Sequence, residues 1–391
     1  MTKLDLDTVQ TYFDEESGVP LSLCFDCHKV ELNGVVAFLE GVPLLKNPDT
    51  GEIYYPNKTK ELLDYYTNKY FQDGDYEITL KQKERQVRYP YSEQFNFLYS
   101  HIDYEYIPGL IRPWNNGFLT PVFFNLAVLN KYTQHPDYKL ELAGESYGTV
   151  YHQDDWYISF GISKSKKVIM WLGDIDDLPD KEKYYLRSEN VDSDHDIHSE
   201  FYDAQIDVKY SKRSALGESI HQRKTINELV KKNYGFDLYV LHGEVSEILA
   251  NLDKPVFWEE KHVSPVIDSL NRIFVESLNT KEICKSIKES GSSADTKSLK
   301  GNKLFQLWLN DVLNIQNTDY LACPFFVLYD FRVMCTHLLS EDKKKEMFSS
   351  ICKRLDLNQE TASLEQLFNE TLKRIIKSYT NINESIIRVS T

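Results

Sequence analysis

The chain has 391 residues, enough for roughly two or three domains, and its 41% hydrophobic content favours a globular protein over a disordered one. Its net charge of −15 argues against a simple nucleic-acid coat protein. The charge is uneven: 26 basic and 42 acidic residues precede Lys254, whereas 19 basic and 18 acidic residues lie from Lys254 onward. A near-neutral C-terminal region can present a local basic cleft to RNA, which the acidic region would repel.

The chain start and the cysteines predict the compartment. Residues 1–5 have neither the cationic nor the apolar segment of a signal peptide. The longest apolar stretch, near Val35–Leu45, contains Glu40 and is too short to span a bilayer. Six scattered cysteines form no disulfide framework. We therefore expect a cytoplasmic protein with reduced thiols and no membrane partner.

Residues 1–253 are expected to form an acidic α/β region with a sensor or regulatory role, either as one domain or as two, 1–90 and 91–253. Period-2 and period-3.6 patterns distinguish its strands from its helices. Strands are expected at Leu21–Phe25, Tyr76–Val87, Tyr138–Leu142, Asp155–Ile162, Lys167–Leu172 and Glu200–Tyr210. Helices are expected at Lys58–Phe71, Pro179–Leu186, Thr225–Asn233 and Glu244–Leu252.

Cys24, Cys27 and His28 form a Cys-x-x-Cys-His sequence near the start of this region. Covalent haem attachment would require an exported protein. A zinc site would need ligands from distant residues, because the chain has no second Cys-x-x-Cys pair. A strand with buried thiols is the simpler interpretation, and we expect no cofactor.

A second group of ligand-type side chains lies between Arg187 and Glu200. Carboxylates and imidazoles in this density could hold a divalent metal or a polar ligand. The competing interpretation is a solvated loop whose short polar residues cap the neighbouring elements. If the segment binds a ligand, we expect the contacts to come from Arg187, Asp194, His195, His198 and Glu200.

Residues 255–391 carry mostly helical patterns, so the predicted fold class is α+β, with a β-rich N-terminal region and an all-α C-terminal bundle. A boundary near Lys254 and Pro255 coincides with the change in charge. Helices are expected at Val263–Leu278, Lys303–Val312, Phe325–Leu339, Lys344–Arg354 and Leu364–Ile376, with Pro324 in the first turn of the third.

Arg332 and His337 form the only Arg-x4-His sequence in the chain. On a continuous helix the two side chains would lie about 140° apart, but both are long enough to converge on one cleft if a second helix packs alongside. A charged arginine in an apolar segment must be paired or line a groove. Histidine can move protons near neutral pH, and a guanidinium can stabilise charge on phosphate oxygens.

This Arg-x4-His motif, within the sequence Leu328–Leu338, resembles the HEPN superfamily, and most closely its Apea-like branch in bacterial antiphage proteins. The resemblance extends over about residues 255–391. It implies a metal-independent endoribonuclease that acts as a homodimer, joined through the helical domain, with Arg332 and His337 as catalytic residues. It further implies a toxin of antiviral defence by abortive infection, restrained by the N-terminal region until a phage-derived trigger is sensed.

Two other functions are compatible with the sequence. Val333 follows the motif arginine where the superfamily often has a polar residue, which favours an inactive HEPN-like dimerisation or interaction protein whose N-terminal region binds a ligand or partner. A metal-dependent activity centred on His195 and His198 is the third hypothesis. The chain has no phosphate-binding glycine loop, nucleophile elbow or zinc-protease motif.

Overall fold

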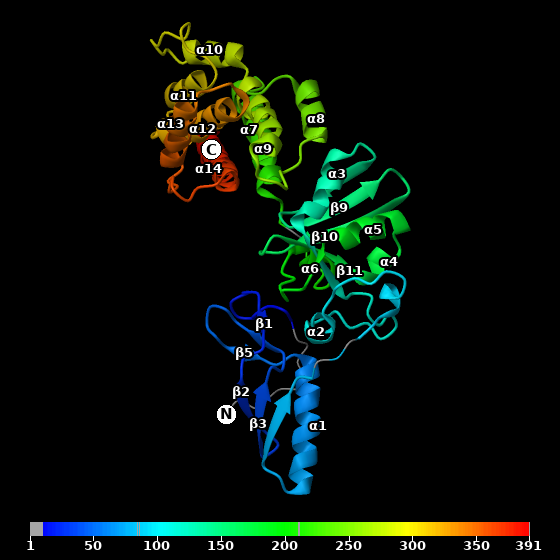
Figure 1. The fold of residues 1–391 in the computed structure, drawn as a ribbon. Helices are drawn as coiled ribbons and strands as arrows, with labels where there is room; N and C mark the ends of the chain where they lie inside the picture. The colour runs from blue at the N-terminus through cyan, green and yellow to red at the C-terminus, as the bar shows by residue number, and fades with distance from the viewer. Residues whose placement is uncertain (1–10, 84, 86, 210–211, 391) are drawn as a thin grey trace. The chain divides into compact units, whose positions relative to one another are not determined.

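The computed structural model describes residues 11–83, 85, 87–209 and 212–390. Residue contacts divide the chain into two compact units, Met1–Lys212 and Arg213–Thr391, and each is considered by itself. The first unit combines strands and helices, and the second is helical (Figure 1). The predicted α+β class is therefore confirmed. None of the described helices is both long enough and apolar enough to cross a membrane.

The first unit begins with two three-stranded sheets and one long helix. The sheet β1-β4-β5 comprises Ser22–Cys24, Leu44–Lys46 and Ile53–Tyr54. The sheet β2-β3-β6 comprises His28–Leu32, Val35–Glu40 and Glu77–Lys81, and α1 (Asn57–Asp73) packs against β3. Alternate residues of β3 are buried, as a half-buried strand requires. The expected helix at Lys58–Phe71 is confirmed, whereas the strand expected at Tyr76–Val87 ends at Lys81.

A six-stranded antiparallel sheet forms the rest of the first unit, in the order β12-β7-β11-β10-β9-β8. In chain order, β7 to β12 are Pro121–Asn125, Tyr138–Leu142, Tyr147–His152, Trp156–Ile162, Lys167–Trp171 and Asn190–Val191. Its helices are η1 (Pro90–Ser92), α2 (His101–Tyr106), η2 (Leu126–Leu129), α3 (Asn130–Gln134), α4 (Leu172–Asp176), α5 (Asp180–Glu189) and α6 (Glu200–Gln205). The expected β10–β11 hairpin is confirmed, with Gly161 opposite Ile169.

The strand predicted at Glu200–Tyr210 is wrong, because its first part is helix α6. Ser199 caps this helix by accepting a hydrogen bond from the Tyr202 amide. Phe201 and Tyr202 are fully buried on it, and Phe201 stacks on Trp171 of the sheet. Adjacent buried aromatic residues look strand-like in sequence but suit a short helix lying on a sheet. Tyr210 itself lies outside the described residues.

Eight α-helices and a π-helical turn make up the described part of the second unit. They are α7 (Ala215–Tyr234), α8 (His242–Ala250), α9 (Glu260–Asn271), η3 (Arg272–Glu276), α10 (Thr280–Glu289), α11 (Asn302–Asp311), α12 (Thr318–Thr336), α13 (Glu341–Arg354) and α14 (Leu364–Ser390). Helix α12 packs against α9, α13 and α14. The division between the units precedes the boundary expected near Lys254, because Ile226 and Val230 of α7 share one core with Tyr379 and Ile382 of α14.

Helix α12 also begins earlier than expected. It starts at Thr318, and Pro324 lies inside it rather than in its first turn. Proline in a helix interior removes one backbone hydrogen bond. Leu321, Phe325 and Leu328 are buried in the core of the unit, and this packing outweighs the lost hydrogen bond.

Candidate functional site

Arg332 and His337 lie at the C-terminal end of α12. The helix ends at Thr336, and His337 has an extended backbone with φ −99° and ψ 149°. Because His337 has left the helix, its side chain turns back, and Arg332 Nη1 lies 3.0 Å from His337 Nε2. The two groups therefore meet directly, and no second helix is needed to bring them together.

Helix α9 contributes an acidic residue to this pair. Arg332 Nε donates to Asp268 Oδ1 at 3.0 Å, and Arg272 Nη2 lies 2.8 Å from Asp268 Oδ2. One carboxylate thus joins two guanidinium groups, one from α12 and one from η3. Asp268 and Arg272 were not among the predicted site residues, although they are spaced i,i+4 in a predicted helix.

The contact with Arg332 gives each side chain a hydrogen-bonding role. A guanidinium can only donate hydrogen bonds, so Arg332 Nη1 is the donor and the lone pair of His337 Nε2 accepts. The Nε2 lone pair is therefore occupied as long as it accepts this hydrogen bond from Arg332. If an anion draws the guanidinium away, that lone pair becomes available to accept a proton.

The cluster formed by Arg332, His337, Asp268 and Arg272 lies at the surface of the helical unit. The Arg332 side chain is 26% exposed, that of Arg272 is 56% exposed, and His337 is exposed. The neighbouring Phe331, Met334 and Cys335 are buried and fix the end of α12. Two arginines and one aspartate carry a net charge of +1, which suits an anionic ligand.

A buried arginine of α7 braces the helix end that carries Arg272. Arg223 donates through Nε to Ile273 O and through Nη2 to Ser277 Oγ, both at 2.9 Å. In the π-helical turn, the Ser277 amide bonds to Arg272 O rather than to Ile273 O, which leaves the Ile273 carbonyl for Arg223. Burial lowers the pKa of Arg223, whose guanidinium also lies 4.2 Å from the centre of the Tyr239 ring.

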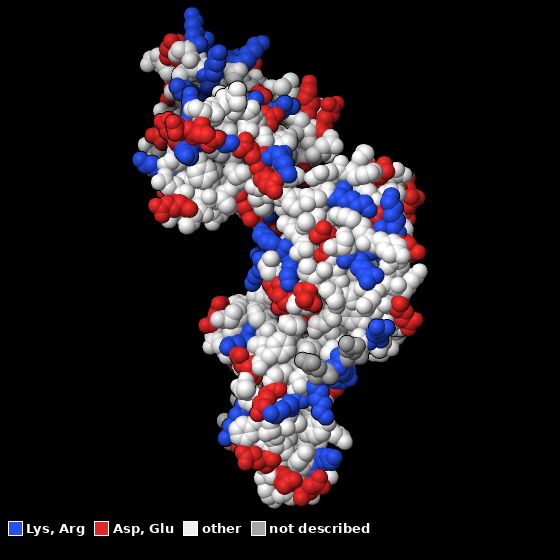
Figure 2. Space-filling model, viewed as in Figure 1, with Lys and Arg blue, Asp and Glu red and all other residues white. Residues whose placement is uncertain are grey.

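Charges of both signs are present on the face of the helical unit drawn in Figure 2. On the face drawn in Figure 2, lysine and arginine alternate with aspartate and glutamate, so that face offers no continuous basic surface. Phosphate binding would depend on individual arginines there.

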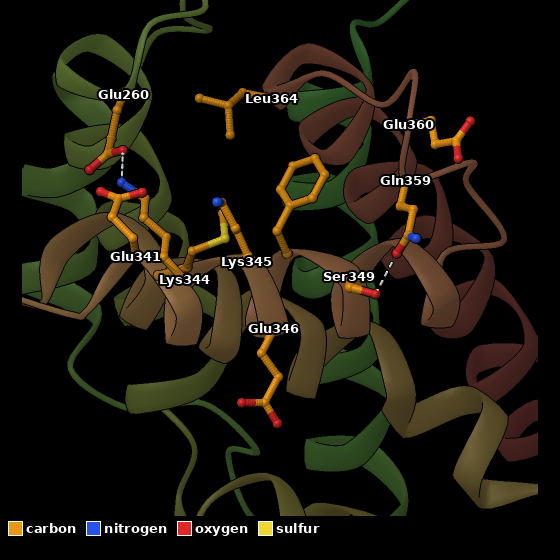
Figure 3. A pocket seen from close by; sticks show the side chains of 11 residues that line it. Glu260, Glu341, Lys344, Lys345, Glu346, Ser349, Gln359, Glu360 and Leu364 are labelled. Atoms are coloured by element: carbon orange, nitrogen blue, oxygen red, sulfur yellow. Dashed lines mark hydrogen bonds and ion pairs between the residues drawn. The ribbon is translucent and has the colours of Figure 1, made fainter.

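A hollow of about 620 Å³ lies between α9, α13 and the start of α14 (Figure 3). Met334, Phe348 and Leu364 supply its apolar lining, Glu260 pairs with Lys344, and Ser349 Oγ donates to Gln359 Oε1 at 2.5 Å. Neither Arg332 nor His337 lines it. Its charged residues are four glutamates and two lysines: Glu260, Glu341, Glu346, Glu360, Lys344 and Lys345. This excess of acid disfavours phosphate groups.

A second polar cluster lies in the first unit, around Asp103 of α2. This carboxylate is fully buried and lies 2.6 Å from His195 Nδ1 and 2.6 Å from Ser193 Oγ. His195 has a left-handed backbone with φ 65°, which is uncommon for a residue other than glycine. His195 was among the predicted ligand-binding residues, whereas Asp103 was not, because the two lie 92 residues apart.

The other residues of the predicted ligand site point to different places. His198 Nε2 donates to Leu21 O at 2.7 Å, and its ring stacks on Tyr12. Asp194 pairs with Lys167 at 3.2 Å. Glu200 accepts from the Ser146 amide at 2.9 Å, and Arg187 is exposed on α5. These contacts tie the loop to its surroundings rather than converging on one ligand.

The two histidines of this loop have pKa values shifted in opposite directions. The hydrogen bond to Asp103 raises the pKa of His195, whereas burial lowers that of His198. The contribution of His195 to stability is full below its unfolded pKa of about 6.5 and is lost as the pH rises through the folded value. The contribution of His198 has the opposite sign, since it is present above about pH 6.5 and is lost as the pH falls.

We expect His195→Asn to remove the pH dependence of stability that is due to His195 and to leave the one that is due to His198. Asparagine tolerates the left-handed backbone and can donate to Asp103 but does not titrate. The difference in free energy of unfolding between wild type and variant should shrink as the pH rises from about 6 to about 9. Urea unfolding at several pH values measures it, and a constant difference would count against a charged His195–Asp103 pair.

Cys24, Cys27 and His28 are not assembled into a metal site. His28 Nε2 lies 2.7 Å from Tyr55 OH, Cys27 is exposed, and burial raises the pKa of Cys24. All six cysteines are free thiols. Throughout the described part of the chain, no three histidine, cysteine, aspartate or glutamate side chains are grouped so that they could hold a metal ion. This includes the neighbourhood of His195 and His198.

Comparisons of the chain with protein-family models, with curated proteins and with solved structures found no match.

Proposed function

We propose that the helical unit is a metal-independent endoribonuclease and that Arg332 and His337 are its catalytic residues. The observation that carries this proposal is the 3.0 Å contact between Arg332 Nη1 and His337 Nε2, at the surface and braced by Asp268. A proton-transfer group and a phosphate-binding cation thus lie side by side. RNA supplies its own nucleophile, the ribose 2′-hydroxyl, so these two groups cover the chemistry that cleavage needs.

The reaction would begin when a phosphate of RNA binds Arg332. The anion competes for Nη1, which releases the Nε2 lone pair of His337 to take the 2′-hydroxyl proton. The 2′-oxygen attacks phosphorus, and Arg332 stabilises the charge on the pentavalent phosphorane. The bond to the 5′-oxygen then breaks as that oxygen takes a proton from water. Products are a 2′,3′-cyclic phosphate and a 5′-hydroxyl. In this order of steps, binding of the substrate phosphate activates His337 as the base.

The wider biological role belongs to the same proposal. The resemblance to the HEPN superfamily implies a homodimer, and the fully exposed Leu338 beside His337 offers an apolar contact for a second copy. The first unit would slow cleavage, without abolishing it, until a phage-derived trigger binds. The protein would then act as a toxin in antiviral defence by abortive infection.

An oligonucleotide with one ribonucleotide in an otherwise 2′-deoxy strand tests the reaction directly. In the presence of EDTA, the purified chain should cut only on the 3′ side of that ribonucleotide, because only there is a 2′-hydroxyl available. Equal cleavage of an all-deoxy strand would contradict attack by the 2′-hydroxyl. Loss of cleavage on adding EDTA would contradict the metal-independent mechanism.

Asp268 is a positioning residue in this account. Asp268→Asn should lower the cleavage rate constant roughly tenfold to 100-fold, because Arg332 loses the ion pair that orients it. The same change removes a negative charge, so RNA should bind at least as tightly as before. Slower cleavage with undiminished binding distinguishes positioning from general damage to the site, and an unchanged rate would remove Asp268 from the mechanism.

The alternative is an inactive interaction module, and one observation favours it. Arg332 already has partners for both Nε and Nη1, so the pair satisfies itself in the absence of substrate. In that case the cluster would stabilise the end of α12 and no RNA would be cleaved.

A further inference from the structure

Arg272 lies beside the Arg332–His337 pair but outside the motif. It is the first residue of η3, and its ion pair with Asp268 holds it on the same carboxylate as Arg332. Only Nη2 is used in that ion pair, and 56% of the side chain is exposed. Arg272 therefore has donors left for a ligand in solvent, whereas Arg332 is engaged by Asp268 and His337.

Shared use of Asp268 keeps the two guanidinium groups apart but adjacent. One carboxylate oxygen faces each arginine, at 3.0 Å for Arg332 and 2.8 Å for Arg272. Guanidinium groups bind phosphates well because their fork of donors matches phosphate oxygens. A strand whose cleaved phosphate lies on Arg332 would bring a neighbouring phosphate within reach of Arg272.

The charges around the site favour one path for such a strand. Along α9, Glu260 lies eight residues before Asp268, which is about 12 Å toward the helix start. That end borders the hollow with four glutamates and two lysines, which repels phosphates. Arg272 lies at the opposite end of α9, where Arg223 fixes the backbone.

We propose that Arg272 binds a phosphate next to the cleaved one, so that the substrate is a single RNA strand with at least one flanking phosphate on the Arg272 side. This inference rests on the proposed function, since it assumes that RNA binds at Arg332. It adds a specificity residue to the site. It predicts that the protein acts on RNA strands longer than a dinucleotide, because a dinucleotide has no flanking phosphate.

Salt-dependent binding tests this inference without cleavage. Full-length His337→Ala protein binds a labelled 2′-O-methyl RNA decamer, and the dissociation constant is measured over a range of salt concentrations. Adding Arg272→Gln should reduce the slope of log affinity against log salt by about 0.7, the value for one phosphate contact in a single strand. Arg272→Lys keeps the charge and should retain the slope.

Arg213→Gln is the matched control. Arg213 is also in the helical unit, is 52% exposed and pairs with Glu218, but lies outside the cluster. Equal slopes for Arg272→Gln and Arg213→Gln would overturn the inference. The slope reports phosphate contact alone, so a wild-type protein that binds RNA without cleaving it would contradict the proposed function while leaving the role of Arg272 measurable.

Discussion

Replacing His337 by alanine should slow RNA cleavage by roughly 100-fold to 10,000-fold, the range that general acid–base groups contribute. The substitution removes the imidazole that contacts Arg332 and is proposed to take the 2′-hydroxyl proton. Arg332 would keep its ion pair with Asp268, so binding of RNA should change little. The measurement is the single-turnover rate constant on a short RNA, with wild type and variant at equal concentration.

A matched histidine substitution controls for general effects. His221 is exposed on α7 in the same unit, and His221→Ala should cleave at the wild-type rate. Both variants should unfold at the wild-type temperature, because surface substitutions rarely change stability. Wild-type cleavage by His337→Ala would contradict its catalytic role.

The second large effect concerns stability of the first unit. His195→Ala should lower its free energy of unfolding by about 3 kcal/mol, because Asp103 would remain as a buried charge held only by Ser193. The double variant His195→Ala/Asp103→Ala should be more stable than His195→Ala alone, since it removes the unpaired charge as well. Urea unfolding measures both values. If the double variant is the less stable one, the unpaired charge is not the cause.

Local patterns predicted the elements whose periodicity agrees with their burial. The β10–β11 hairpin and α1 follow from alternation and helical spacing, and both are present as expected. The wrong predictions concern elements whose structure depends on packing between residues far apart in the chain. Helix α6 looked like a strand because its buried residues face the sheet, and α12 extends through Pro324 because its other side chains are in the core.

The candidate site was predicted only as far as one local spacing allows. The motif identified Arg332 and His337. Their direct contact depends on where α12 ends, and no residue before His337 is a helix-termination signal. Asp268 lies 64 residues from Arg332, and no local pattern links them. The same holds for Asp103 and His195. Partners brought together by tertiary structure give no signal in a single sequence.

The most direct test of the central claim is cleavage of total cellular RNA in EDTA by the purified full-length protein, compared with an Arg332→Ala/His337→Ala variant. We predict fragments ending in 2′,3′-cyclic phosphate from wild type and intact RNA from the variant. Intact RNA with both proteins, or equal cleavage by both, would contradict a ribonuclease at this site.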